Sequence, residues 1–163
     1  MAVNIKSLRP DQINRLEGML GPAKAGLPRL LQYCDYVTYE PGQIVCEVGS
    51  IADFLIVILD GRLRVMVKKP TGQLFFLRHA EPGESLGEVA MLDAGMRSAT
   101  VEVEKLTNAL KINRDDFEKL RMTEPAIMTE MLRYMFIQIC REFRDLTKRL
   151  TNDSTLRDIF GGN

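Results

Sequence analysis

The residues best suited to bind a ligand lie in the stretch LGEVAMLDAGMRSAT, residues 86–100, where Glu88 and Arg97 stand among small and apolar neighbours. A guanidinium stays charged at physiological pH and binds phosphate through paired hydrogen bonds. Ser98, beside Arg97, adds a hydroxyl donor. A carboxylate repels phosphate but accepts hydrogen bonds, so its natural partner is a hydroxyl group. A sugar phosphate carries both groups, although the same spacing also allows Glu88 and Arg97 simply to form an ion pair.

Two elements must position these side chains. The run GEVAML predicts a short helix opened by Gly87, and the first N–H groups of a helix have no partner within it, which favours an anion there. A β-rich run begins at Ser98. Arg97 therefore stands at the start of this run, close enough in sequence to fold back over the start of the helix.

The middle of the chain, from residue 33 to about residue 112, is a series of short β-rich runs separated by turn residues. The turns are EPGQ, LDG, KPTGQ and EPGES, and the runs are CDYVTY, QIVCEV, FLIVIL, RLRVMV, LFFLRHA and SATVEVEKLTNALKI. Such regular spacing of strands and turns predicts an antiparallel barrel or sandwich. Partial alternation within RLRVMV places Leu63, Val65 and Val67 toward the core.

Helical patterns flank the β-rich region on both sides. Residues 8–32 predict one or two short helices joined by a glycine-proline turn in GPAKAGLP. Asn113 is suited to cap a helix over NRDDFEKL, and a helix of about 26 residues without glycine follows. Its apolar residues form one stripe at intervals of three and four: Leu132, Met135, Ile139, Phe143, Leu146 and Leu150. The stripe either packs on the barrel alone or pairs with a second copy of the helix.

Composition narrows the classes of function. The chain has 163 residues, with 22 Lys and Arg against 22 Asp and Glu, so no overall charge attracts nucleic acid or an anionic membrane. Cys34, Cys46 and Cys140 are odd in number and widely spaced, which favours reduced, buried thiols in a cytoplasmic protein. A single histidine, His79, excludes a histidine-rich metal centre but leaves a mixed carboxylate site open. The N-terminal stretch is charged throughout, so neither a signal peptide nor a membrane anchor is expected.

The run PGESLGEVAMLDAGMRSATVEV resembles the phosphate-binding cassette of cyclic-nucleotide-binding domains of the catabolite-activator and cyclic-AMP-dependent kinase regulatory type. The resemblance continues through PGQIVCEVGSIADFLIVILDGRLRVMV and GQLFFLRHAEPGESLGE, from Tyr39 to the long helix. It implies an α+β fold: an antiparallel β-roll, a double-stranded jelly-roll-like barrel, with N-terminal helices, a short phosphate-cassette helix and a long C-terminal helix. The residues that match the cassette pattern are Gly87, Glu88, Val89, Ala90, Arg97, Ser98 and Ala99.

The resemblance implies a role for each part of the cassette. Glu88 is expected to accept a hydrogen bond from the ribose 2′-hydroxyl, and Arg97 to bind the cyclic phosphate. Ser98 and the backbone amides of residues 87–90 complete the phosphate site, while Val65 and Leu77 line the purine side under the long helix. The residue that reads the purine is left open among Gln138, Arg141 and Glu142, so the ligand is cyclic AMP or cyclic GMP. Met96 stands where many members of the family have proline.

These patterns divide the chain into an N-terminal helical segment (1–32), the cyclic-nucleotide-binding β-roll (33–123), a long helix acting as lid and dimerisation element (124–150) and a tail (151–163). We expect a cytoplasmic sensor, without catalytic activity or metal, in which ligand repositions the long helix and so regulates homodimer or protein-partner contacts. Only 13 residues follow Leu150, too few for a helix-turn-helix of the kind such regulators append, so no direct nucleic-acid contact and no membrane contact are expected. The alternative is a β-roll interaction module that no longer binds nucleotide.

Overall fold

The computed structural model describes residues 3–152. The N-terminal part is helical, as predicted, and is made of short pieces: η1 (Ile5–Ser7), α1 (Pro10–Leu20), η2 (Gly21–Gly26), α2 (Leu27–Leu30) and η3 (Leu31–Tyr33). The predicted glycine-proline turn is instead the 3₁₀ helix η2. Pro22 stands near its start, where the fixed φ of proline suits the first helical turn and its missing N–H is not needed, so the chain keeps winding there.

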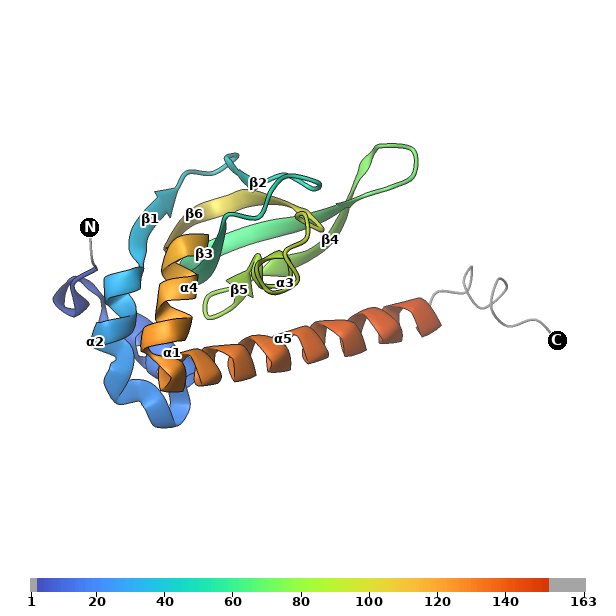
Figure 1. The fold of residues 1–163 in the computed structure, drawn as a ribbon. Coiled ribbons are helices and arrows are strands. Elements are labelled where there is room, and N and C mark those ends of the chain that lie inside the picture. The colour runs from blue at the N-terminus through green and yellow to red at the C-terminus, as the bar shows by residue number, and fades with distance from the viewer. Residues whose placement is uncertain (1–2, 153–163) are drawn as a thin grey trace.

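Six strands form one antiparallel sheet, which confirms the α+β roll (Figure 1). They are β1 (Asp35–Tyr39), β2 (Ile44–Cys46), β3 (Phe54–Lys68), β4 (Leu74–Ala80), β5 (Ser85–Leu86) and β6 (Thr100–Asn113). The order is β1-β6-β3-β4, with β2 also paired to β6 and β5 to β3. The two long strands, β3 and β6, therefore hold all the others in place.

One prediction about the strands is wrong: the LDG turn does not separate FLIVIL from RLRVMV. The chain runs straight through as β3, and the pairing with β6 shifts register around Asp60 and Arg62 instead. Gly61 has a φ of 92°, and a Cβ there would lie 2.4 Å from the carbonyl oxygen of Leu106. Glycine is required here because the bulged strand passes close to its neighbour, not because the chain reverses.

Three helices follow the roll or interrupt it: α3 (Glu88–Leu92), α4 (Arg114–Thr123) and α5 (Pro125–Asn152). Asn113 is the residue before α4, as predicted, but its side chain makes no capping hydrogen bond. The next residue, Arg114, contacts two other segments: its guanidinium donates to the carbonyl oxygens of Ala52, at 2.6 Å, and of Ala90, at 3.1 Å. These bonds fasten α3 to the start of α4.

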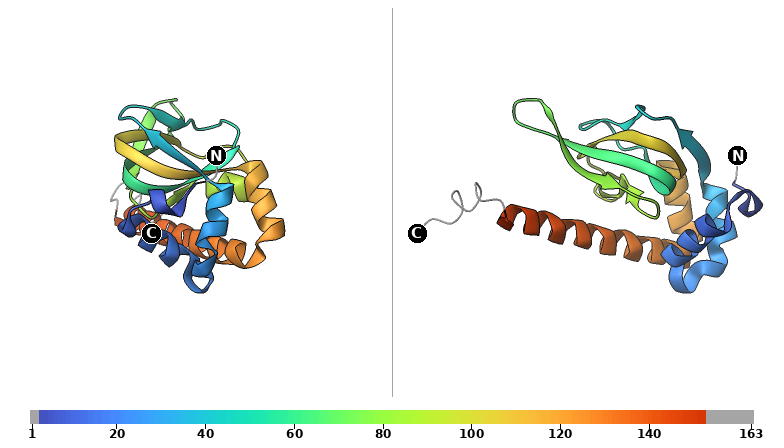
Figure 2. Two further views of the ribbon diagram at one scale, coloured as in Figure 1. Left: turned by 90° about the vertical axis from the view of Figure 1, so that its left-hand side faces the viewer. Right: turned by 180° about the vertical axis from the view of Figure 1, so that it is seen from behind.

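Two apolar cores support the roll. The inner one, between the strands, contains Ile56, Leu63 and Val65. The outer one joins the N-terminal helices, α4 and the first half of α5, in which Met131 and Met135 are fully buried. Figures 1 and 2 show α5 leaving this cluster and running along one side of the roll.

The predicted stripe on α5 is divided between two environments. Met135 is buried in the outer core and Leu132 and Ile139 are half-buried, whereas the side chain of Phe143 is 69% exposed and that of Leu146 is 37% exposed. Leu150 lies outside the residues whose side chains are described, as does the tail from residue 153. The stripe therefore packs on the protein's own core in its first half and leaves its second half accessible.

Candidate functional site

The predicted phosphate loop forms one wall of a cavity of about 230 Å³ between the roll and α5. The predicted short helix is present as α3, and Gly87 precedes it with a φ of 91°. Every residue predicted to bind the ligand lines this one cavity: Val65, Leu77, Gly87, Glu88, Val89, Ala90, Arg97, Ser98 and Ala99. The fold thus brings together residues from β3, β4, α3 and the loop before β6.

Arg97 is held rigidly in the wall of the cavity and is only 4% exposed. Its guanidinium lies 4.5 Å from the centre of the Phe54 ring and donates to the carbonyl oxygens of Phe54 and Gly87. The nearest carboxylate oxygen is that of Asp53, at 3.9 Å, and this side chain is 72% exposed to solvent. The Nε atom is buried and has no hydrogen-bond partner among the described residues. Arg97 is therefore a fixed, incompletely neutralised positive charge, which is suited to an anionic ligand.

Gly87 is fitted to this arginine. A Cβ atom at position 87 would lie 2.0 Å from Nη1 of Arg97 and 3.1 Å from the carbonyl oxygen of Phe54. Its positive φ also belongs to the backbone region that favours glycine. Both constraints arise because the chain must turn into α3 directly beside the guanidinium.

Glu88 is the second charged group in the cavity, and it is 5% exposed. Its Oε2 atom is buried and has no hydrogen-bond partner in the part of the chain that the structure describes. Burial raises the pKa of Glu88 to about 7; Glu142 acts in the same direction, while a backbone hydrogen bond, Arg78 and Arg97 act against it. No ion pair within 4.0 Å joins Glu88 to Arg97 in the part of the chain that the structure describes, so the ion-pair alternative does not explain these residues.

The rest of the lining is largely apolar. Val65, Val67, Leu77 and Leu86 contribute aliphatic side chains to it. The lining is thus divided between charged groups, which are Arg78, Glu88, Arg97 and Glu142, and aliphatic side chains. A flat, weakly polar group attached to an anionic, hydroxyl-bearing one matches this division.

Helix α5 covers the cavity and is bonded to the roll at several points. The Tyr134 hydroxyl donates to the carbonyl oxygen of Gly83 at 2.8 Å, and the Gln138 amide both accepts from and donates to the backbone of Ser85, at 2.9 and 2.8 Å. Further along, Arg149 donates to the carbonyl oxygen of Leu77 at 2.7 Å. These contacts fix the position of the helix above the site.

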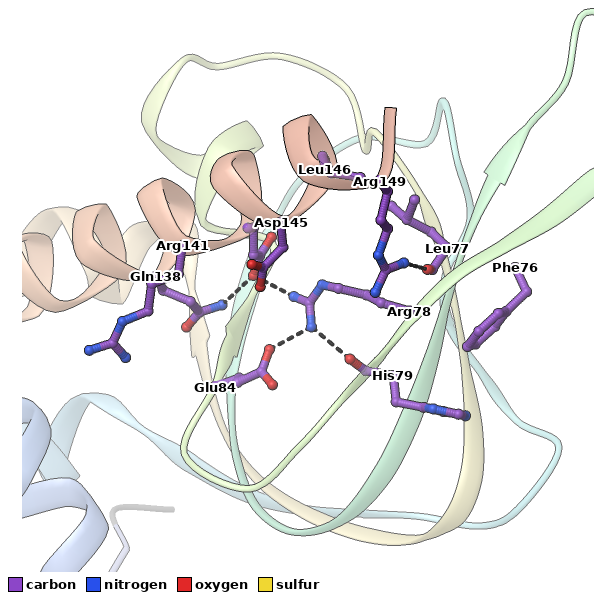
Figure 3. A pocket seen from close by; sticks show the side chains of 11 residues that line it. Phe76, Leu77, Arg78, His79, Glu84, Gln138, Arg141, Asp145, Leu146 and Arg149 are labelled. Atoms are coloured by element: carbon purple, nitrogen blue, oxygen red, sulfur yellow. Dashed lines mark hydrogen bonds and ion pairs between the residues drawn. The ribbon is translucent and has the colours of Figure 1, made fainter. Parts of the chain in front are cut away.

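Arg78 is the central link between α5 and the roll (Figure 3). Its guanidinium donates to Glu84 at 2.6 Å, to the carbonyl oxygen of His79 at 2.8 Å and to Glu142 of α5. Arg78 lines the cavity that holds Arg97, and it also lines a larger neighbouring cavity of about 430 Å³ under α5. A ligand beside Arg97 would therefore meet a residue that holds the helix.

Sequence reasoning missed Arg78 and only partly described its surroundings. Gln138, Arg141 and Glu142, named as candidates for reading a purine, all line the larger cavity, but only Glu142 also lines the cavity of Arg97. Gln138 is already bonded to Ser85, and Arg141 is exposed. The sequence did contain a signal for Arg78, since it stands within the otherwise largely apolar run LFFLRHA. Burying a charged side chain in such a strand costs free energy unless the charge has partners.

The cysteines and His79 form no separate centre. Cys34 is buried and Cys46 and Cys140 are half-buried, and all three are free thiols. Cys46 lines the cavity of Arg97. Among residues 3–152 no three His, Cys, Asp or Glu side chains are grouped so that they could hold a metal ion.

The fold and the cavity define a β-roll with a cavity beside its cassette. Residues 36–124 match the family model described as "Cyclic nucleotide-binding domain", and the chain belongs to that family. The family assignment therefore agrees with the resemblance seen in the cassette.

Relatives in sequence are large proteins of which this chain covers a small part. The chain is 30% identical over 127 residues to a lysophospholipase nte1 of Aspergillus fumigatus, covering 76% of this chain and 8% of that protein. The corresponding protein of Neosartorya fischeri is 29% identical over 141 residues, 83% of this chain and 9% of its own length. The chain thus spans less than a tenth of these relatives.

Solved structures share the fold. A cyclic nucleotide-binding domain from Methylobacillus flagellatus superposes with a TM-score of 0.77 at 19% identity, covering 84% of this chain and 81% of that one. The catabolite activator protein of Thermus thermophilus has a TM-score of 0.62 at 22% identity, with 89% and 60% covered. The regulatory domain of protein kinase A from Toxoplasma gondii, crystallised with cyclic AMP, has a TM-score of 0.62 at 14% identity, with 72% and 45% covered.

Proposed function

We propose that this chain is a cyclic-nucleotide sensor whose ligand, cyclic AMP or cyclic GMP, occupies the cavity between the cassette and α5. One observation carries the proposal: Glu88 and Arg97 are both buried in the same cavity, each with a polar atom that no group among residues 3–152 satisfies. Burying such atoms costs free energy, and a ligand that pairs with both would recover that cost.

In this proposal Arg97 binds the cyclic phosphate and Glu88 accepts from the ribose 2′-hydroxyl. Ser98 and the N–H groups of residues 87–90 complete the phosphate site, because the first turn of α3 leaves its N–H groups without partners inside the helix. Val65 and Leu77 supply the apolar side for the purine, next to Ala99. The role is binding rather than catalysis, in keeping with the family to which the chain belongs.

Ligand binding would be transmitted through the contacts of Arg78. This side chain lines the proposed ligand cavity and bonds Glu142, so a nucleotide that shifts Arg78 changes the position of α5 favoured by the protein. A ligand can move this equilibrium only by binding one arrangement more tightly than the other. The exposed apolar residues of α5, including Phe136 and Phe143, are the proposed contacts with a second copy or another protein.

Calorimetric titration with cyclic AMP and, separately, cyclic GMP tests the proposal. We expect saturable binding of at least one of them, accompanied by a change in amide hydrogen exchange over residues 138–149 of α5. If neither nucleotide releases heat at high micromolar concentration, the chain is an interaction module that has lost its ligand. If a nucleotide binds while exchange in α5 is unchanged, the binding part of the proposal stands and the helix part is wrong.

A further inference from the structure

The hairpin between β3 and β4 projects from the body of the protein (Figures 1 and 2). The pairing of β3 with β6 ends at Met66 and Thr100, whereas the pairing with β4 continues to Lys68 and Leu74. Within the described ranges of the chain, residues 67–75 are therefore a two-stranded ribbon with no third strand beside it. We call residues 68–76 the hairpin tip. Its turn is closed by a bond from the N–H of Gly72 to the carbonyl oxygen of Lys69, at 2.8 Å.

The hairpin tip exposes apolar side chains on both of its faces. Leu74 and Phe75 are 44% and 49% exposed. Phe76, at the base of the tip, is 43% exposed, and its ring lies beside that of His79, with 4.8 Å between the ring centres. Successive side chains of a strand point to opposite faces, so Phe75 lies on one face of the ribbon and its two neighbours on the other. A flat protein surface can cover only one face of such a ribbon. A lipid interface that the ribbon enters end-on surrounds both.

The charge of the hairpin has one sign, although the chain as a whole is neutral. Residues 61–80 contain five cations and no Asp or Glu: Arg62, Arg64, Lys68, Lys69 and Arg78. The three arginines are paired with glutamates of neighbouring segments. The two lysines, at the tip, form no ion pair within the described residues, and Lys69 lies over the ring of Phe75 at 5.0 Å. Cations beside exposed aromatic and aliphatic groups are the pattern of segments that rest on anionic bilayers.

We propose that the hairpin tip docks peripherally on an anionic lipid bilayer. Leu74 and Phe75 enter the boundary between headgroups and acyl chains, and Lys68 and Lys69 contact the lipid phosphates. The contact is peripheral, since no helix within residues 3–152 has both the length and the apolar character needed to span a bilayer. The sequence-based expectation of no membrane contact rested on the net charge of the whole chain and on the lack of a spanning helix. Neither criterion detects a short hairpin with a local positive charge.

Vesicle co-sedimentation of the full chain tests the proposal. The chain should bind vesicles of phosphatidylcholine with phosphatidylserine, bind vesicles of phosphatidylcholine alone much more weakly, and be released by salt. The double variant Lys68→Glu/Lys69→Glu should lose at least about fivefold in affinity per lysine. Lys105→Glu and Leu106→Ser are matched controls, because Lys105 is exposed and Leu106 is 50% exposed away from the hairpin. Both should bind like the unmodified chain.

Because the chain contains no tryptophan, Phe75→Trp provides a single fluorescent reporter at the tip. Its emission should shift to the blue on adding anionic vesicles, whereas that of Leu106→Trp should not. The proposal is overturned if the chain does not bind anionic vesicles, if the hairpin and control variants lose binding equally, or if the reporter does not shift. It is also overturned if Phe75→Ser dissociates a dimer in sedimentation velocity but leaves vesicle binding unchanged, because the tip then contacts a second copy.

Discussion

Replacing Glu88 by glutamine should stabilise the protein at alkaline pH. Burial raises the pKa of Glu88 from 4.5 to about 7, the Glu142 carboxylate of α5 adds to the shift, and Arg78 of β4 and Arg97 oppose it. The folded state therefore keeps a proton that the unfolded state has lost between these two values. The contribution of Glu88 to the unfolding free energy is therefore largest below pH 4.5 and falls as pH rises toward 7, by about 1.4 kcal/mol per pH unit.

The expected size of this effect follows from the same two values. Between about pH 5.5 and about pH 8 the unmodified chain should lose about 2 kcal/mol that Glu88→Gln does not lose. Urea unfolding of both proteins without ligand at these two pH values measures the difference. A constant cost of burying the glutamine amide cancels in this comparison, because it is the same at both pH values.

The control is Glu118→Gln, which changes an exposed carboxylate on α4 that pairs with Arg121. Its unfolding free energy should follow that of the unmodified chain at both pH values. If the difference between Glu88→Gln and the unmodified chain stays constant from acid to alkaline pH, Glu88 does not carry the buried proton and the reasoning is wrong. If Glu88→Gln is more stable than the unmodified chain but binds nucleotide more weakly, Glu88 contributes to ligand binding and lowers the stability of the fold.

Three further results are expected. Arg97→Ala should lower the affinity for the bound nucleotide at least about tenfold in calorimetry while the circular dichroism spectrum is kept, since charged hydrogen bonds contribute roughly 1.5–3 kcal/mol each; unchanged affinity would remove Arg97 from the site. Gly87→Ala should lower the unfolding free energy measured in urea by about 2 kcal/mol more than Gly72→Ala does. Both glycines have a positive φ, but only a Cβ at position 87 meets Arg97. Equal losses would mean that the backbone conformation alone, and not the contact with Arg97, requires glycine. Phe143→Glu should give a smaller sedimentation coefficient if α5 forms a dimer, and Met122→Glu, at an exposed apolar residue of α4, is the charge-matched control.

The strands and the cassette could be predicted because their signals are local. Turn residues separate the β-rich runs, and Gly87, Glu88 and Arg97 lie within ten residues of each other in sequence. The wrong break at Gly61 has a physical reason, since a bulge and a turn both require a positive φ and both select glycine. Which one forms depends on how closely Leu106 of β6 approaches, and that distance is set by the whole sheet.

Contacts between distant segments could not be predicted. Arg78 and Glu142 are 64 residues apart, and neither residue type specifies the other as its partner. The spacing of Glu88 and Arg97 left an ion pair open, because nothing in the sequence shows that Phe54 lies under the guanidinium. The periodicity of the sequence predicted the apolar stripe on α5. It did not show that the protein's own core stops covering this stripe after Ile139.

The division of α5 gives the helix the mechanics of a lever arm. Met131 and Met135 fix its first part in the outer core, and α5 ends at Asn152. An α-helix rises 1.5 Å per residue, so the arm beyond Met135 is about 26 Å long, and a tilt of about 10° there carries its end through about 4–5 Å. Bonds to Ser85 and Leu77 lie along this arm, at increasing distance from the pivot. A small rearrangement near Gln138 is therefore enlarged toward Arg149, and a spectroscopic label placed on the last turns of the helix would record it most sensitively.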